Sequence, residues 1–440
     1  MLRTLAVCLL ASSVIAKGLP KEKGLGKLAI VTNFVGRDAR YKAVQKLAKA
    51  RGAKVYRFKE GKLAAVRGRL AGAGVEFVAI AVTPETIDIN FHYDVLELCR
   101  NLDDDPMPDF CFGYLSAREG DDLARMVERI LEKEARPPEK PTAKVIALTG
   151  TGAQLAGLDF ALHFGHGQAW RVDKGMTGVE VGKLELQRAP VIWSGACFNG
   201  VFSRSYHKCA YQPIFMRPTT IKPEHVMTLN WVHAGVSGYF AALEGDRGEM
   251  AMAEWDYFRE KACSLGEVMT YQYRLAFTSL PADFAGFPRY INGRKKRTRF
   301  YDVMLRGMVS RLLLSDPACR PLRTPLATPV HATTVGTADG SLTITIKLLR
   351  WTPGHHLNYL PRSGKGIFDA RVYERVRVDH KGKLGEPTIT VDSGPRAVEL
   401  SRWRVREELW GGQRYLNLQV EAPTGSFRKN TIVTFVFPAK

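Results

Sequence analysis

The first 135 residues alternate between short apolar runs and longer segments whose apolar residues recur at helical spacing. KLAIVTNFV (27–35) and VEFVAIAV (75–82) are typical of strands buried on both faces. In SAREGDDLARMVERILEKEA (116–135) the apolar positions recur every three or four residues, which indicates an amphipathic helix. Strands that alternate with helices predict an α/β fold with a mostly parallel sheet, flanked by helices on both faces.

The pattern changes after about Pro325. Six short strand-like segments follow in roughly 115 residues, separated by Gly and Pro and without helical periodicity. We therefore predict an all-β immunoglobulin-like sandwich over 326–440. It would follow an α/β domain over 17–325 that consists of two halves, about 17–140 and 141–325.

The extreme N-terminus has the pattern of an export signal. Arg3 precedes an apolar run from Thr4 to Ile15, and a small residue, Ala16, stands before Lys17. This pattern predicts a signal peptide over 1–16, and the run is too short to span a bilayer as a helix. We expect a periplasmic or extracellular protein with no transmembrane segment in the mature chain.

The net charge of +20 argues for affinity toward anionic material. Such material includes a cell-envelope surface, polyanionic sugars and nucleic acid, and a signal peptide speaks against a nucleic-acid role. An anionic cell-envelope surface is therefore a candidate partner. Six cysteines remain after residue 16, too few for a scaffold built from disulfides, although one or two bridges stay open.

Two stretches in the middle of the chain carry reactive side chains. LHFGHGQAW (162–170) and VIWSGACFNGVF (191–202) are apolar runs that end in small residues, with His166 at one break and Cys197 at the other. Because the carboxyl ends of neighbouring parallel strands meet at one edge of a sheet, we expect these side chains to lie close together. A thiol beside an imidazole predicts a cysteine nucleophile with His166 as its acid and base.

Other residues have candidate supporting roles. The backbone N–H groups of Gly167 and Cys197 are candidate oxyanion donors, each typically worth about 10²–10³ in rate. Asp159, just before the His166 strand, is a candidate to orient the imidazole. Trp193 and Trp231 are candidate walls of a specificity pocket. No metal-ligand spacing is recognisable, and no cofactor is predicted.

GHG around His166 and ACFNGVF (196–202) together resemble the catalytic signature of the gingipain family of cysteine peptidases, in the group with caspases and legumain. The segments 108–134, 245–250 and 313–319 are similar to further family segments, so the resemblance covers about 27–325. It implies a gingipain-like cysteine endopeptidase with His166 and Cys197 as catalytic residues. Family members commonly carry an immunoglobulin-like sandwich after this domain. Relatives hold structural calcium, but no loop here dictates a calcium site.

The chain also departs from the family pattern. The stretch before His166 is short and lacks the acid that lines the family's specificity pocket, so a preference for Arg or Lys is not carried over. Asp246 is the nearest substitute. Two other readings remain open: a non-catalytic surface-binding or envelope-binding protein that uses the peptidase fold as a scaffold, and another thiol-dependent acyl transfer.

Overall fold

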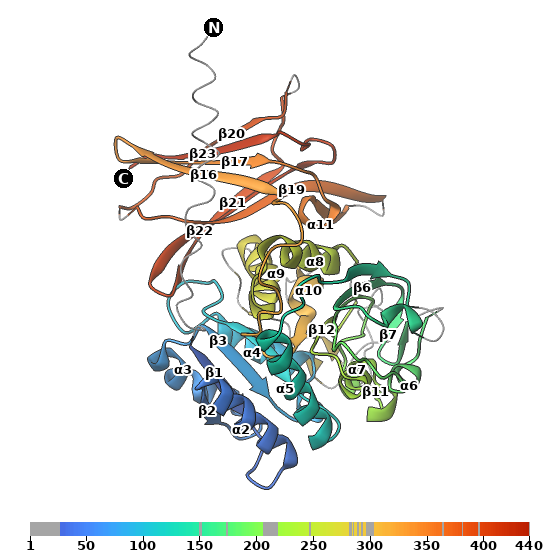
Figure 1. Ribbon diagram of the computed structural model, residues 1–440. Helices are drawn as coiled ribbons and strands as arrows, with labels where there is room; N and C mark the ends of the chain where they lie inside the picture. The colour runs from blue at the N-terminus through green and yellow to red at the C-terminus, as the bar shows by residue number, and fades with distance from the viewer. Residues whose placement is uncertain are drawn as a thin grey trace.

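A large sheet flanked by helices lies beside two smaller, stacked sheets (Figure 1). The computed structural model describes residues 27–148, 152–172, 175–205, 219–245, 248–280, 284, 286–287, 290–291, 294–295, 303–362, 365–380, 382–394 and 397–439. The predicted signal peptide, 1–16, lies outside these residues. No helix in the described part of the chain has the length and apolar character needed to cross a membrane.

The large sheet has nine strands. In spatial order they are β2 (Lys54–Arg57), β1 (Leu28–Thr32), β3 (Phe77–Ala81), β4 (Cys111–Leu115), β15 (Arg311–Leu314), β12 (Gly238–Ala242), β9 (Val191–Gly195), β6 (Phe160–Phe164) and β5 (Ala143–Ile146). The strands from β2 to β15 run parallel to one another, as do those from β12 to β5. The two groups meet at β12 and β15, which are antiparallel. The predicted mostly parallel α/β sheet is confirmed, and its two halves run in opposite directions.

Helices flank this sheet (Figure 1). They are α2 (Ala39–Arg51), α3 (Arg67–Ala73), α4 (Ile89–Cys99), α5 (Gly120–Ala135), α6 (Gly178–Val181), α7 (Met227–Ala234), α8 (Gly248–Lys261), α9 (Leu265–Ser279) and α10 (Val303–Ser310), with short 3₁₀ turns at Leu63–Val66, Pro84–Thr86, Ala153–Leu155 and Pro223–His225. No sequence pattern predicted α9. This helix is buried almost all round, with polar residues such as Gln272 and Arg274 inside, so it shows no amphipathic pattern.

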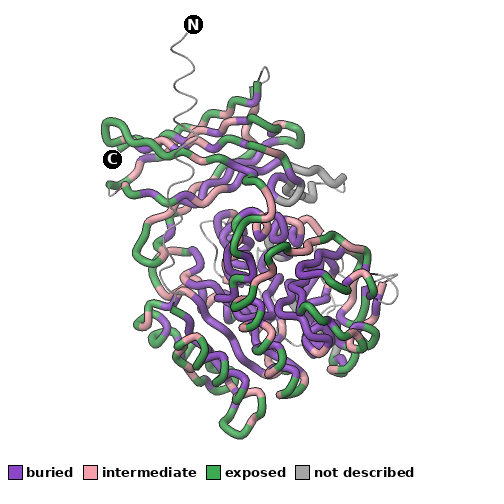
Figure 2. The backbone as a smooth tube through the Cα atoms, in the orientation of Figure 1, coloured by how far each residue is buried: buried purple, intermediate pink, exposed green. Residues whose placement is uncertain are grey.

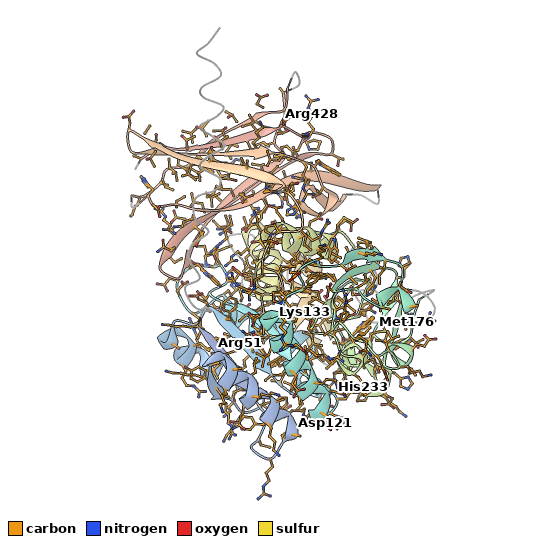
Figure 3. The ribbon with its side chains drawn as sticks, viewed as in Figure 1. Arg51, Asp121, Lys133, Met176, His233 and Arg428 are labelled. Carbon is orange, nitrogen blue, oxygen red and sulfur yellow. The ribbon has the colours of Figure 1, made fainter. Side chains whose placement is uncertain are left out.

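Two buried cations tie the helices to distant strands and loops (Figure 3). Arg51, on α2, forms ion pairs with Glu134 at the end of α5 and with Asp316 just after β15. Lys133, on α5, donates from Nζ to the carbonyl oxygens of Arg188 and Ala189, just before β9. Burial lowers the pKa of Lys133 to about 8. The second contact joins the two halves of the large domain through a helix of the first half.

The C-terminal residues form two antiparallel sheets. One contains β16 (His331–Ala338), β17 (Ser341–Leu348), β23 (Ile432–Phe437) and β20 (Thr388–Asp392), and the other contains β18 (Leu357–Arg362), β19 (Lys365–Arg377), β22 (Gln413–Pro423) and β21 (Arg402–Trp410). A short helix, α11 (Pro353–His356), precedes β18. Alternate residues such as Ile344, Leu418 and Phe435 face one another in a shared core. The all-β part of the predicted fold is confirmed, with β16 and β18 in addition to the expected strands.

The sandwich packs directly against α9. Arg274 donates from Nε to Glu408 Oε1 at 2.9 Å, and its guanidinium lies 4.5 Å from the centre of the Trp410 ring. Glu408 also accepts two hydrogen bonds from Arg375 and one from Asn417. An ionic cluster around the buried Glu408 carboxylate therefore joins the two parts. The domain boundary near 325 remains a prediction, and it falls between β15 and β16.

Candidate active site

The strands that precede His166 and Cys197 are hydrogen-bonded neighbours. β6 and β9 pair in parallel, with His163 opposite Ser194 and Phe164 opposite Gly195. The loops that leave these strands therefore start level with each other at the same edge of the sheet. His166 is exposed and Cys197 is half-buried, so reagents in solution can reach both loops.

Glycines allow the two loops to touch. A Cβ atom on Gly167 would lie 2.5 Å from the carbonyl oxygen of Cys197 and 2.8 Å from Ala196 Cβ. A Cβ atom on Gly195 would lie 2.6 Å from the Phe164 ring. Real side chains do not tolerate such distances, so both positions require glycine. The structure thus places Gly167 against the Cys197 backbone, while its role as an oxyanion donor stays a prediction.

The turn after Cys197 is held in a rarely populated backbone conformation. Phe198 has a φ of 58°, in the left-handed region that bulky residues seldom adopt. Its N–H donates to the Glu244 carbonyl at 2.9 Å, and the Gly200 N–H donates to the Ala242 carbonyl at 2.8 Å. These bonds anchor the turn to the end of β12. Such conformations persist only where the surroundings enforce them, and they cluster at active sites.

Asn199 links the Cys197 turn to the His166 loop. Its Nδ2 donates to the carbonyl oxygens of Gln168 at 2.7 Å and Arg171 at 3.3 Å, both in the hairpin that follows His166. Its Oδ1 accepts from Ser194 Oγ at 3.1 Å. The Asn199 carbonyl accepts from Thr228 Oγ1 on α7. The sequence signal for Asn199 is only that a polar residue stands within an apolar turn; its burial and its bonding partners come from the fold.

Cys197 differs from the other described cysteines. All five are free thiols, and four of them are buried: Cys99, Cys111, Cys263 and Cys319. Burial raises the pKa of each of these four thiols, to about 12 for Cys111. Only the thiolate is nucleophilic. Within the described residues, Cys197 is therefore the thiol that reagents can reach. Cys209 lies outside them.

Asp159 does not lie near His166. It stands at the amino end of β6, whereas His166 follows the carboxyl end. Its Oδ2 accepts from the Thr142 N–H at 3.0 Å and from Arg188 Nη1 at 3.2 Å. The hypothesis that Asp159 orients the imidazole is corrected accordingly: this carboxylate ties the start of β6 to neighbouring segments.

Trp193 and Trp231 belong to the core rather than to an open pocket. Neither side chain is exposed. Trp193 stacks on Phe240 with ring centres 4.8 Å apart, and Trp231 packs against Tyr239. A fully buried indole cannot contact a substrate, so the interpretation of both as pocket walls is corrected. Asp246, the candidate specificity acid, lies outside the described residues. Within them, no group of three or more His, Cys, Asp or Glu is placed to hold a metal ion.

His163 lies beneath the site, fully buried, and neither ring nitrogen has a hydrogen-bond partner within the described residues. Burial, helped by the charge of Arg311, lowers its pKa from 6.5 to about 4. The unfolded chain therefore takes up this proton first as the pH falls. The free energy of unfolding is therefore unaffected by this titration above about pH 6.5, where the imidazole is neutral in both states. It falls by up to roughly 3 kcal/mol as the pH drops toward 4.

We predict that His163→Leu flattens the fall of the unfolding free energy between pH 6.5 and 4 and changes it little at pH 7. His92→Leu is the matched control, because burial also lowers the pKa of His92 to about 4. Its ring, however, bonds Tyr114 Oη and the Val309 carbonyl, so its loss costs stability already at pH 7. Urea titrations across this range measure both, and an unchanged slope in His163→Leu contradicts the prediction.

Comparison with known proteins gives two similar structures. No protein-family model and no curated protein sequence matches the chain. A complex of the pro- and mature domains of Porphyromonas gingivalis RgpB aligns with a TM-score of 0.45 and 12% identity, over 79% of this chain and 96% of that one. A structure described as a protease aligns with a TM-score of 0.45 and 10% identity, over 95% and 98%.

Proposed function

We propose that this protein is an exported cysteine endopeptidase with Cys197 as nucleophile and His166 as its acid and base. The observation that carries the proposal is the contact of the two loops. They leave register-matched ends of β6 and β9, and Gly167 lies directly against the backbone of Cys197. The anchored turn at Phe198 and the half-buried thiol support the same conclusion.

In the proposed reaction, His166 takes the Cys197 proton and the thiolate attacks the scissile carbonyl carbon. The N–H groups of Gly167 and Cys197 donate to the oxyanion. As the C–N bond breaks, His166 gives the proton to the leaving amine, which leaves a thioester on Cys197. Water then attacks the thioester, releases the carboxylate product and restores the thiol.

Labelling with a peptidyl acyloxymethyl ketone tests this proposal. The thiolate displaces the carboxylate leaving group, and we expect one label, on Cys197, located by mass spectrometry after digestion. Cys197→Ala should take up none at that position, and the buried Cys263 serves as an internal control. A folded protein whose Cys197 stays unlabelled with reagents of varied sequence contradicts the proposal and favours the non-catalytic scaffold.

Asn199→Leu should impair peptide hydrolysis through loop position rather than through chemistry at Asn199 itself. It breaks the two bonds to the His166 hairpin while keeping a similar side-chain volume. Because a displacement of about 1 Å costs about 10²-fold, we expect kcat to fall by about that factor, with a smaller change in KM. Ser194→Ala, which removes only the bond to Asn199 Oδ1, should have a milder effect. Equal kcat in Asn199→Leu and wild type contradicts this role.

A further inference from the structure

Half of the chain's net charge is concentrated in one short segment. Residues 27–76 contain thirteen Lys or Arg against three Asp or Glu, a net charge of +10 out of the +20 for the whole chain. This segment forms β1, α2, β2 and α3, at one end of the nine-stranded sheet. A local excess of this size makes a strong electrostatic field at that end of the molecule.

Most of these cations point into solvent. The exposed ones are Lys27, Arg37, Lys42, Lys46, Lys49, Lys54, Arg57, Lys59, Lys62, Arg67 and Arg69, which together we call the basic edge. In the described part of the chain, the cations of this segment that form ion pairs are Arg40, Lys46 and Arg51. The outer surface of α2, β2 and α3 is correspondingly exposed (Figure 2). Most of the charge therefore remains available to an external anion.

The basic edge surrounds one strand of the large sheet, β2. β2 is the outermost strand, and it pairs only with β1 in the large sheet. Its Arg57 lies over the Tyr41 ring of α2, and Arg69 of α3 lies over its Tyr56 ring. These contacts join strand and helices into one basic surface. A broad surface of this kind matches an extended array of charges better than a single linear chain.

The aromatic residues here argue against nucleic acid. Binding of single strands relies on open aromatic faces for base stacking. Tyr41 and Tyr56 are only partly exposed, and each has an arginine over its ring, at 4.6 Å and 5.3 Å from the ring centre. Among the described residues of this segment, Val35 is the single large apolar residue that is exposed. The segment therefore has no group of apolar side chains that could anchor it deep in a bilayer. Attraction to anionic headgroups at a surface fits both facts.

We infer that the basic edge docks this protein on an anionic lipid surface. This docking role is separate from the proposed peptidase function and does not depend on it. β2 lies at one end of the sheet and the pair β9–β6 lies toward the other, so docking through β2 leaves the Cys197 and His166 loops free (Figure 1). The interaction is electrostatic, so added salt weakens it.

Sedimentation with vesicles tests the inference. The full chain should bind vesicles of 40 mol% phosphatidylglycerol in phosphatidylcholine at low salt, but not vesicles of phosphatidylcholine alone. Each Lys or Arg at such a surface raises partitioning about fivefold. The variant Lys42→Gln, Lys54→Gln, Lys59→Gln, Arg67→Gln should therefore bind at least about a hundredfold more weakly.

A matched control removes the same kind of charge elsewhere. Lys347→Gln, Lys383→Gln, Arg402→Gln and Lys429→Gln together change four exposed sandwich residues, the same number of charges, and should reduce binding far less. Equal losses in the two variants, or no vesicle binding by wild type, overturn the inference. Binding to a soluble sulfated polysaccharide without binding to vesicles also overturns it and assigns the edge to a polymer. The Cys197→Ala variant should bind vesicles like wild type, which separates this result from the fate of the peptidase proposal.

Discussion

Replacement of Cys197 by alanine is expected to lower the rate of peptide hydrolysis by about 10⁴-fold or more, while the protein stays folded. The estimate follows from nucleophile removal in enzymes that act through an acyl-enzyme, where the loss approaches the whole contribution of the catalytic group. Cys197 is half-buried at a turn anchored by backbone bonds from Phe198 and Gly200, so loss of the sulfur leaves the fold intact. Cleavage of a proteome-derived peptide pool, read by mass spectrometry, measures the loss.

His166→Ala should reach a similarly low rate, and the double variant should be little worse than either single one. Residues that act as a unit in one step give strongly non-additive losses. Thermal unfolding serves as the control for folding. Hydrolysis by folded Cys197→Ala at the wild-type rate would refute the proposed mechanism. Independent, multiplying losses for Cys197 and His166 would show that the two side chains do not work together.

Arg311→Met should lower the free energy of unfolding by about 3–5 kcal/mol. Arg311 and Glu254 are both fully buried, and the guanidinium pairs with the carboxylate at 2.6 Å and 2.7 Å. Without the guanidinium, Glu254 is left as an unpaired carboxyl group in the core. Burial already raises the pKa of Glu254 against the lowering effect of Arg311. Urea unfolding at pH 7 measures the change.

The double variant Arg311→Met, Glu254→Leu provides the control. Replacing both members of a buried ion pair by apolar residues of similar size is often neutral or stabilising, so most of the lost stability should return. Arg311 Nη1 also donates to the Ser194 carbonyl at 3.1 Å, on the strand that leads to Cys197. The double variant should therefore fold well but hydrolyse peptides more slowly than wild type. An equally unstable single and double variant contradicts this account of the pair.

Local patterns predicted much of the fold. The mostly apolar run at 75–82 became β3, and the amphipathic stretch at 116–135 became α5, which starts only at Gly120. Both patterns follow from which faces of an element are buried. The patterns fail where a buried helix contains polar residues among its buried positions, as in α9, or where a strand is mostly exposed, as in β16. In those elements the side chains carry no periodic signal.

The candidate site was predictable only in part. His166 and Cys197 were visible because each follows an apolar run and stands among small residues. The role of Asn199 was hidden, because its partners at Gln168 and Arg171 are 31 and 28 residues away in the chain. Asp159 was assigned by its nearness in sequence to His166. The extended strand β6 lies between the two residues, so they stand at its opposite ends although they are close in sequence.

The sequence by itself determined the alternation of strands and helices, the all-β tail and the two loops with their reactive side chains, because these depend on local burial and backbone preference. Only the tertiary structure decided the strand order, which sets β9 beside β6 and joins two parallel halves of opposite direction at β12 and β15. It also decided that Trp193 is core and that Asn199 ties the loops. Long-range pairing produces these features, and a local pattern records which faces are buried but not what covers them.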